Sequence, residues 1–141
     1  MRKHSMIIII ALFTAVAAQA DGFRELDLAV SSLTRGFERG ESHPIVNGIG
    51  DQVMLEFPGL VSESGFFGRD QASYVLDELF KRALPTGFDV MNARKVSAQN
   101  QYHINGKWSI EIENESQTRE VHITLQNRDD RWFVASIRSL Q

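Results

Sequence analysis

The stretch from Phe88 to Leu140 most constrains the fold, because apolar and polar residues alternate along it between short turns. A period of two is the spacing of side chains along a β-strand, and the turns divide the stretch into segments of strand length. It therefore predicts consecutive antiparallel strands, mostly a meander. The earlier part of the chain has helical spacing, so we expect an α+β fold with helices packed against the sheet.

The turn residues place the expected strands. The pair Asn105-Gly106 is the strongest short hairpin signal, and it predicts a turn between strands at Gln99–Ile104 and Lys107–Glu113. The other strands are expected at Phe88–Val96, Arg119–Gln126 and Arg131–Arg138, with turns at Asn114–Gln117 and Asn127–Asp130.

The alternation also assigns faces to the sheet. Apolar triplets that alternate with polar residues should face the helices: Trp108, Ile110 and Ile112 in one strand, and Val121, Ile123 and Leu125 in the next. The last strand is apolar on both sides, with Trp132 and Val134 on one face and Phe133, Ala135 and Ile137 on the other. Such a strand is expected to be central in the sheet or to be covered by a partner.

Two long helices and one strand pair are expected before the meander. The first helix, capped by Asp21, has an apolar stripe of Phe23, Leu26, Val30, Leu33 and Phe37, and the second spans Arg69–Leu84. On the second helix Ala72, Val75, Leu76, Leu79, Phe80 and Ala83 share one face. Between the helices, Gln52–Phe57 is expected as a strand with Leu60–Ser64 pairing back onto it.

The first 20 residues have the three-part pattern of a secretory signal peptide. Arg2 and Lys3 form the basic start, 6–17 is an apolar run, and Ala18-Gln19-Ala20 matches the small-x-small cleavage pattern. The run is shorter than the roughly 20 residues of a membrane-spanning helix. We therefore expect cleavage before Asp21, export to the periplasm or medium, and no membrane association afterwards.

The remaining 121 residues, 21–141, are the length of a single domain. Removal of Arg2 and Lys3 lowers the basic residues from 15 to 13 against 18 acidic ones, a formal charge of −5. This balance argues against nucleic acid or an anionic membrane surface as the partner. The sequence has no Cys, so disulfides and thiolate chemistry are excluded.

Motifs for catalysis and for cofactors are absent from the sequence. It has no His-x-His or His-Glu-x-x-His for a metal, no glycine-rich phosphate loop and no Gly-x-Ser-x-Gly for a nucleophile. Asp129-Asp130 falls at a hairpin tip, where turn formation accounts for both residues. We therefore predict no metal and no cofactor.

The order of elements resembles the nuclear-transport-factor-2-like (NTF2-like) cone, part of a cystatin-like superfamily. More narrowly, LTRGFERG at 33–40, FGRDQASYVLDELF at 67–80 and VHITLQNRDDRWFVASIR at 121–138 resemble an uncharacterised family of small secreted bacterial proteins within it. The resemblance implies a curved sheet wrapped around helices, a pocket at the open end and dimerisation across the sheet. It implies no activity, although the superfamily includes ketosteroid isomerases and scytalone dehydratase.

Those enzymes place an ionisable residue inside the cone, where low polarity tunes its pKa. Tyr102 and His103, which lie on opposite faces of one expected strand, are the proton-transfer candidates here. The other ionisable residues favour structural roles: His122 should face outward, Tyr74 lies off the apolar side of its helix, and His43 and Asp51 fall near breaks.

Two functions from different classes follow from these patterns. The first is a non-enzymatic secreted or periplasmic module that binds a small ligand or a protein, with Trp132 and Val134 as a candidate homodimer interface. The second is a small lyase or isomerase that uses Tyr102 or His103 for acid–base chemistry in an internal pocket. An enclosed cavity with converging polar groups would favour the enzyme, and a solid apolar core would argue against it.

Overall fold

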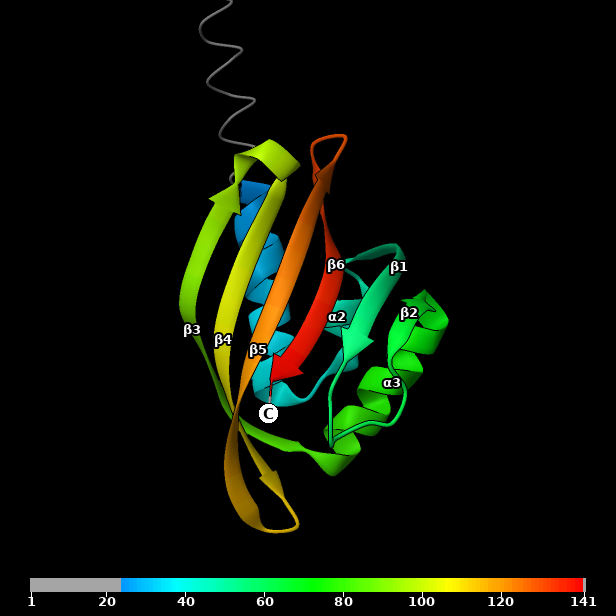
Figure 1. The fold of residues 1–141 in the computed structure, drawn as a ribbon, viewed down its shortest axis with the longest axis vertical. Coiled ribbons are helices and arrows are strands. Elements are labelled where there is room, and N and C mark those ends of the chain that lie inside the picture. Colours follow the sequence, from blue (N-terminus) through cyan, green and yellow to red (C-terminus); the bar gives the residue numbers. More distant parts are fainter. Residues whose placement is uncertain (1–23, 141) are drawn as a thin grey trace, which may run out of the picture.

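A curved six-stranded sheet covered on one face by helices makes up the computed structural model, which describes residues 24–140 (Figure 1). We call the helix-covered face the inner face and the opposite one the outer face. The expected signal peptide at 1–20, the expected cleavage site before Asp21, the expected Asp21 cap and Phe23 lie outside the described residues.

The helices pack on the inner face through the predicted apolar positions. Residues 24–39 form the N-terminal helix, followed by α2 (Ser42–Val46), α3 (Arg69–Arg82) and the short 3-10 turn η1 (Ser97–Gln99). The N-terminal helix ends where Gly40 adopts a φ of 68° and Glu41 N–H donates to Gly36 O at 3.0 Å, a Schellman-type cap. Helix α3 buries Ala72, Val75, Leu76, Leu79 and Phe80, as its periodicity predicts.

The strands form one sheet in the order β2-β1-β6-β5-β4-β3. Their bounds are β1 Ile49–Glu56, β2 Gly65–Gly68, β3 Leu84–Val96, β4 Gln101–Ile112, β5 Glu115–Arg128 and β6 Arg131–Leu140. Strands β3 to β6 are the expected antiparallel meander, whereas β1 pairs in parallel with β6. The predicted α+β cone is thus confirmed, and the last strand is central.

The hairpin predicted at Asn105-Gly106 is wrong, because both residues lie within the continuous strand β4. Gly106 is required there by packing: a Cβ on it would lie 2.3 Å from Cζ of Phe88. The register between β3 and β4 shifts at this point, so Met91 is an extra, bulged residue opposite Asn105 and Gly106. The chain actually turns at η1, where Asn100 adopts a left-handed φ of 52°.

A second bulge explains why β6 is apolar on both sides. Leu125 pairs with Val134 and Thr124 with Ser136, so Ala135 is the extra residue in β6. The alternation therefore shifts by one residue, and Val134 and Ile137 are both buried on the inner face.

The other expected boundaries shift by a few residues. Leu60–Ser64 does not pair with β1, because Leu60 and Val61 donate their N–H groups to Phe57 O in a turn, and β2 pairs with β1 instead. The two last hairpins are tighter than expected, with two-residue turns at Glu113-Asn114 and Asp129-Asp130.

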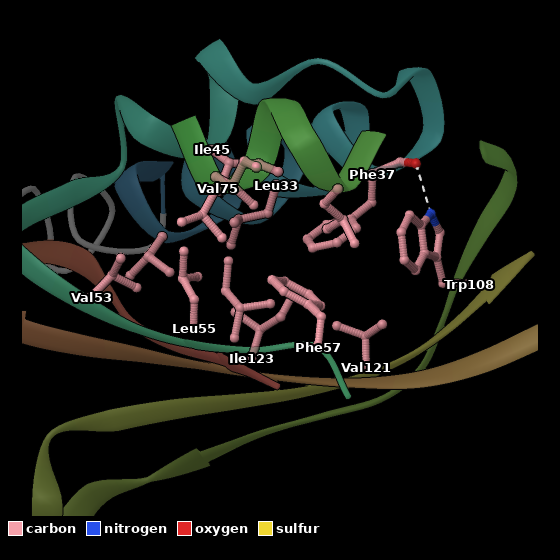
Figure 2. Packing of buried hydrophobic residues seen from close by; sticks show 14 of the residues in the cluster. Leu33, Phe37, Ile45, Val53, Leu55, Phe57, Val75, Trp108, Val121 and Ile123 are labelled. Atoms are coloured by element: carbon pink, nitrogen blue, oxygen red, sulfur yellow. Dashed lines mark hydrogen bonds between the residues drawn. The ribbon is translucent and has the colours of Figure 1, made fainter. Parts of the chain in front are cut away.

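The core lies between the helices and the inner face (Figure 2). The predicted inward residues Trp108, Ile110, Val121, Ile123 and Leu125 are buried there, and Ile112 is partly buried against them. The fold thus places its apolar surface where an internal pocket would otherwise be.

Candidate functional site

Four aromatic side chains fill the interior between the helices and strands β3 and β4 of the sheet. Phe37 of the N-terminal helix stacks on Phe88 at a ring distance of 5.2 Å, and it contacts Phe80 and Trp108 edge to face at 6.0 and 5.4 Å. All four rings are buried. Such close contacts leave this region to packing rather than to a reactant.

The one polar atom of this cluster is satisfied. The indole Nε1–H of Trp108 donates to the backbone carbonyl of Phe37 at 3.0 Å, as the dashed line in Figure 2 shows. That carbonyl belongs to the last turn of the N-terminal helix, where carbonyl groups lack helical donors. The indole therefore caps the helix and is not available to a ligand.

Tyr102 of β4 and Trp132 of β6 lie on the inner face, close to the points where these two strands begin. Their rings pack edge to face at 6.3 Å, and both side chains are partly buried against the core. Val134 is 2% exposed within the core, so it cannot form part of a surface contact. Val134 is therefore part of the core and not of the candidate interface with Trp132, whereas homodimerisation through the sheet stays a prediction.

The three histidines within residues 24–140 lie on the outside of the molecule. His103 alternates with inward residues of β4, and its Nε2 lies 2.8 Å from Gln101 Oε1. His122 is on the outer face, as expected, with its Nε2 2.7 Å from Glu120 Oε1. His43 contacts Asn47 in α2. The structure thus separates Tyr102 and His103 onto opposite faces of β4 and does not bring the ionisable candidates together.

Asp51 also lies outside any enclosed site. It is an exposed residue within β1, rather than a residue before the strand as the sequence suggested. Among residues 24–140, no group of three His, Cys, Asp or Glu side chains is arranged to hold a metal ion.

A surface groove runs along α3, and it is one of several open hollows of similar volume on the part of the chain that the structure describes. It consists of two adjoining pockets of about 400 Å³ each, which share Glu63 and Tyr74. The first is lined by Leu60, Val61, Ser62, Glu63, Tyr74, Glu78, Lys81 and Arg82, and the second by Glu63, Phe67, Asp70, Gln71, Tyr74 and Val75. We call these two pockets together the α3 groove.

The α3 groove has charged side chains at both ends and is aromatic in the middle. The pocket at the start of α3 carries the carboxylates of Asp70 and Glu63, and no ion pair engages them within the described part of the chain. The pocket at the end of α3 carries Lys81 and Arg82 together with Glu78 and the shared Glu63, so its charges balance. Tyr74 has 60% of its surface exposed. The groove is therefore acidic at the start of α3 and close to neutral at its end, with Tyr74 exposed between the two pockets.

The two cations at the end of α3 are partly engaged by the protein itself. Lys81 Nζ lies 3.2 Å from Glu78 Oε1, and Arg82 Nη1 donates to the Leu60 carbonyl at 3.4 Å. Both interactions are long or exposed, so a ligand carboxylate can compete for the two cations at little cost.

Sequence reasoning missed this groove. It set Tyr74 aside because the residue lies off the apolar side of α3, and the structure confirms that orientation. The opposite wall comes from residues 60–63, which were expected in a strand. The available signal was an aromatic residue on the exposed side of an amphipathic helix, but no pattern in the sequence places the facing wall.

Comparison with known proteins agrees with this architecture. Residues 30–139 match the model of a family described as "Domain of unknown function (DUF4783)". A DUF4783 family protein from Bacteroides ovatus superimposes with a TM-score of 0.65 at 22% identity, covering 77% of this chain and 90% of that one. One from Bacteroides fragilis gives 0.64 at 18% identity, covering 77% and 93%.

A more distant neighbour gives the fold its broader class. An NTF2-like protein from Anabaena variabilis superimposes with a TM-score of 0.63 at 15% identity, covering 85% of this chain and 88% of that one. A search among curated proteins gave no match. Within the part of the chain that the structure describes, no helix is long and apolar enough to cross a membrane.

Proposed function

The chain belongs to the DUF4783 family and has an NTF2-like fold, and we propose that it is an exported, non-enzymatic module that binds another protein through its surface. The observation that supports this function best is the filled interior. Phe37, Phe80, Phe88 and Trp108 are all buried and pack ring against ring inside the fold. A site for a partner must then be external.

The placement of polar groups supports the same function. His103 and His122 face outward, where solvent would compete for any transferred proton, and Tyr102 packs on Trp132 instead of a second titratable group. General acid–base catalysis needs donors and acceptors that converge on one reactant. The surface, by contrast, carries the α3 groove with its exposed Tyr74, and aromatic side chains are common anchors at protein interfaces.

Site-specific photo-crosslinking in cells tests this function. A photoreactive phenylalanine analogue would replace Tyr74, Phe66 or His122, which are surface residues on α3, β2 and the outer face. We expect a protein adduct of one discrete mass at one of these positions, and no adduct at the others. Native mass spectrometry of the unmodified protein should give the mass of the chain alone. A small molecule retained inside the fold, with no adduct at any position, would contradict the proposal.

A further inference from the structure

The α3 groove has the dimensions of a site for a short peptide. From Asp70 to Arg82, α3 rises by about 18 Å at about 1.5 Å per residue. An extended chain covers that distance with six or seven residues at about 3.3 Å per step. Tyr74 lies one third of the way along this line, where the side chain of the third peptide residue would fall.

Strand β2 makes an extended peptide the suitable occupant. Phe67 of β2 lines the groove, and β2 is at one end of the sheet order, with β1 as its strand partner among the described residues (Figure 1). The other side of an edge strand presents unpaired N–H and C=O groups. A peptide lying beside β2 could use these groups while its alternate side chains enter the groove.

The charges of the groove give the peptide a direction and a composition. The start of α3, with Glu63 and Asp70 and no cation, complements a basic residue. The end of α3, where Lys81 and Arg82 balance Glu63 and Glu78, is the end that can take an acidic residue. Tyr74, Phe67 and Val75 complement an apolar or aromatic side chain between them. A second copy of this chain is disfavoured at a shared β2 edge, because Glu63 and Asp70 of one copy would approach the same residues of the other.

We propose that the α3 groove binds an extended segment of a partner protein with a basic residue at one end, an apolar residue in the middle and an acidic residue at the other end. This inference rests on the proposed function and adds the place and the chemistry of the contact. Electrostatic complementarity sets the direction of the segment, and the aromatic middle supplies most of the affinity.

The test uses fluorescence anisotropy with labelled heptapeptides and the purified protein. The peptide Arg-Thr-Phe-Thr-Val-Thr-Glu places its two charges and its apolar residues on one face of an extended chain, and Glu-Thr-Phe-Thr-Val-Thr-Arg carries the same residues with the charges exchanged. We expect the first to bind at least about tenfold more tightly than the second. We also expect methylation of its backbone amides on the β2 side to weaken binding, because a methylated amide cannot donate.

Variants of the groove separate a specific site from general charge attraction. The double variant Glu63→Lys/Asp70→Lys should prefer the charge-exchanged peptide, and Tyr74→Ala should weaken both peptides about tenfold. The matched control Asp89→Lys/Glu115→Lys makes the same charge change at exposed positions outside the groove, and it should keep the original preference. Circular dichroism would establish that each variant is folded.

Each other outcome overturns the inference. Equal binding of the two peptides, or an unchanged preference in Glu63→Lys/Asp70→Lys, would show that the groove does not discriminate between peptides by the order of their charges. A photo-crosslinked partner at Phe66 or His122, with no peptide binding in the groove, would leave the proposed function standing and refute this site. Sedimentation that shows dimers lost in Tyr74→Ala would assign the groove to a second copy instead.

Discussion

The residue that joins the two layers of the molecule most directly is Trp108. Its ring fills the space between Phe37 and Phe80, and its N–H satisfies a carbonyl at the end of the N-terminal helix. The replacement Trp108→Phe removes both the indole volume and the donor, so we expect a loss of about 2–4 kcal/mol in the free energy of unfolding. Urea denaturation would measure it.

The matched control for this prediction is Trp132→Phe. Trp132 is only partly buried and makes no hydrogen bond among those the structure shows for residues 24–140. Its replacement should cost less than about 1 kcal/mol. Equal losses in the two variants would mean that the helix-capping hydrogen bond contributes little.

The ring of Phe88 packs against Gly106, which explains why a glycine lies in the middle of β4. An added Cβ would lie 2.3 to 2.9 Å from three ring atoms of Phe88, so Gly106→Ala must displace that ring from its stack on Phe37. We expect Gly106→Ala to destabilise the protein by about 1–3 kcal/mol in urea. In a Phe88→Leu background the same change should cost less, because the smaller side chain can move aside.

Gly87→Ala provides the control within the neighbouring strand. A Cβ on Gly87 meets nothing within 4 Å, so this substitution should change the free energy of unfolding by no more than about 0.5 kcal/mol. If Gly106→Ala were as mild as Gly87→Ala, the close approach of Phe88 to β4 would not exist in solution.

At the scale of elements, two hairpins turn without glycine. Asp129 and Asp130 adopt φ angles of 52° and 64°, and Glu113 and Asn114 adopt 53° and 67°. Two-residue turns with both φ angles positive favour Gly at the second position, because other residues are strained there. We expect Asp130→Gly to raise the free energy of unfolding by about 0.5–1 kcal/mol, measured as an upward shift of the urea midpoint.

The same substitution in a strand should act in the opposite direction. Asp89 is exposed like Asp130 but lies within β3, where Gly loses more backbone freedom than other residues do. Asp89→Gly should therefore lower the free energy of unfolding by about 0.5–1 kcal/mol. A gain at both sites would point to removal of negative charge as the cause, rather than relief of turn strain.

The elements that periodicity could predict are those whose burial has one regular period. Helix α3 and the inward triplets of β4 and β5 follow their expected faces because no extra residue interrupts them. Asn105-Gly106 and Ala135 did not follow the pattern. Each lies at or opposite a bulge, and a bulge depends on the neighbouring strand, which local sequence does not specify.

At the scale of the whole molecule, the candidate site was harder to predict than the fold. The α3 groove brings Tyr74 beside the 60–63 segment, and their apposition depends on how β1 inserts beside β6 in parallel. A parallel pairing of strands so distant in the sequence has no local signal. The filled interior, by contrast, follows from apolar residues that the sequence already assigned to inward positions.

The first 20 residues of the chain predict that the protein is exported. Expressed with its own N-terminus in a Gram-negative host, the protein should appear in the osmotic-shock fraction with an intact mass that begins at Asp21. Ala20→Phe should leave the uncleaved chain in the membrane fraction, because the cleavage position accepts only small residues. Gln19→Phe places the same side chain at the variable position and should be processed normally. Normal processing of both variants would refute a cleavage site between Ala20 and Asp21, and retention of the unmodified chain in the cytoplasm would refute export itself.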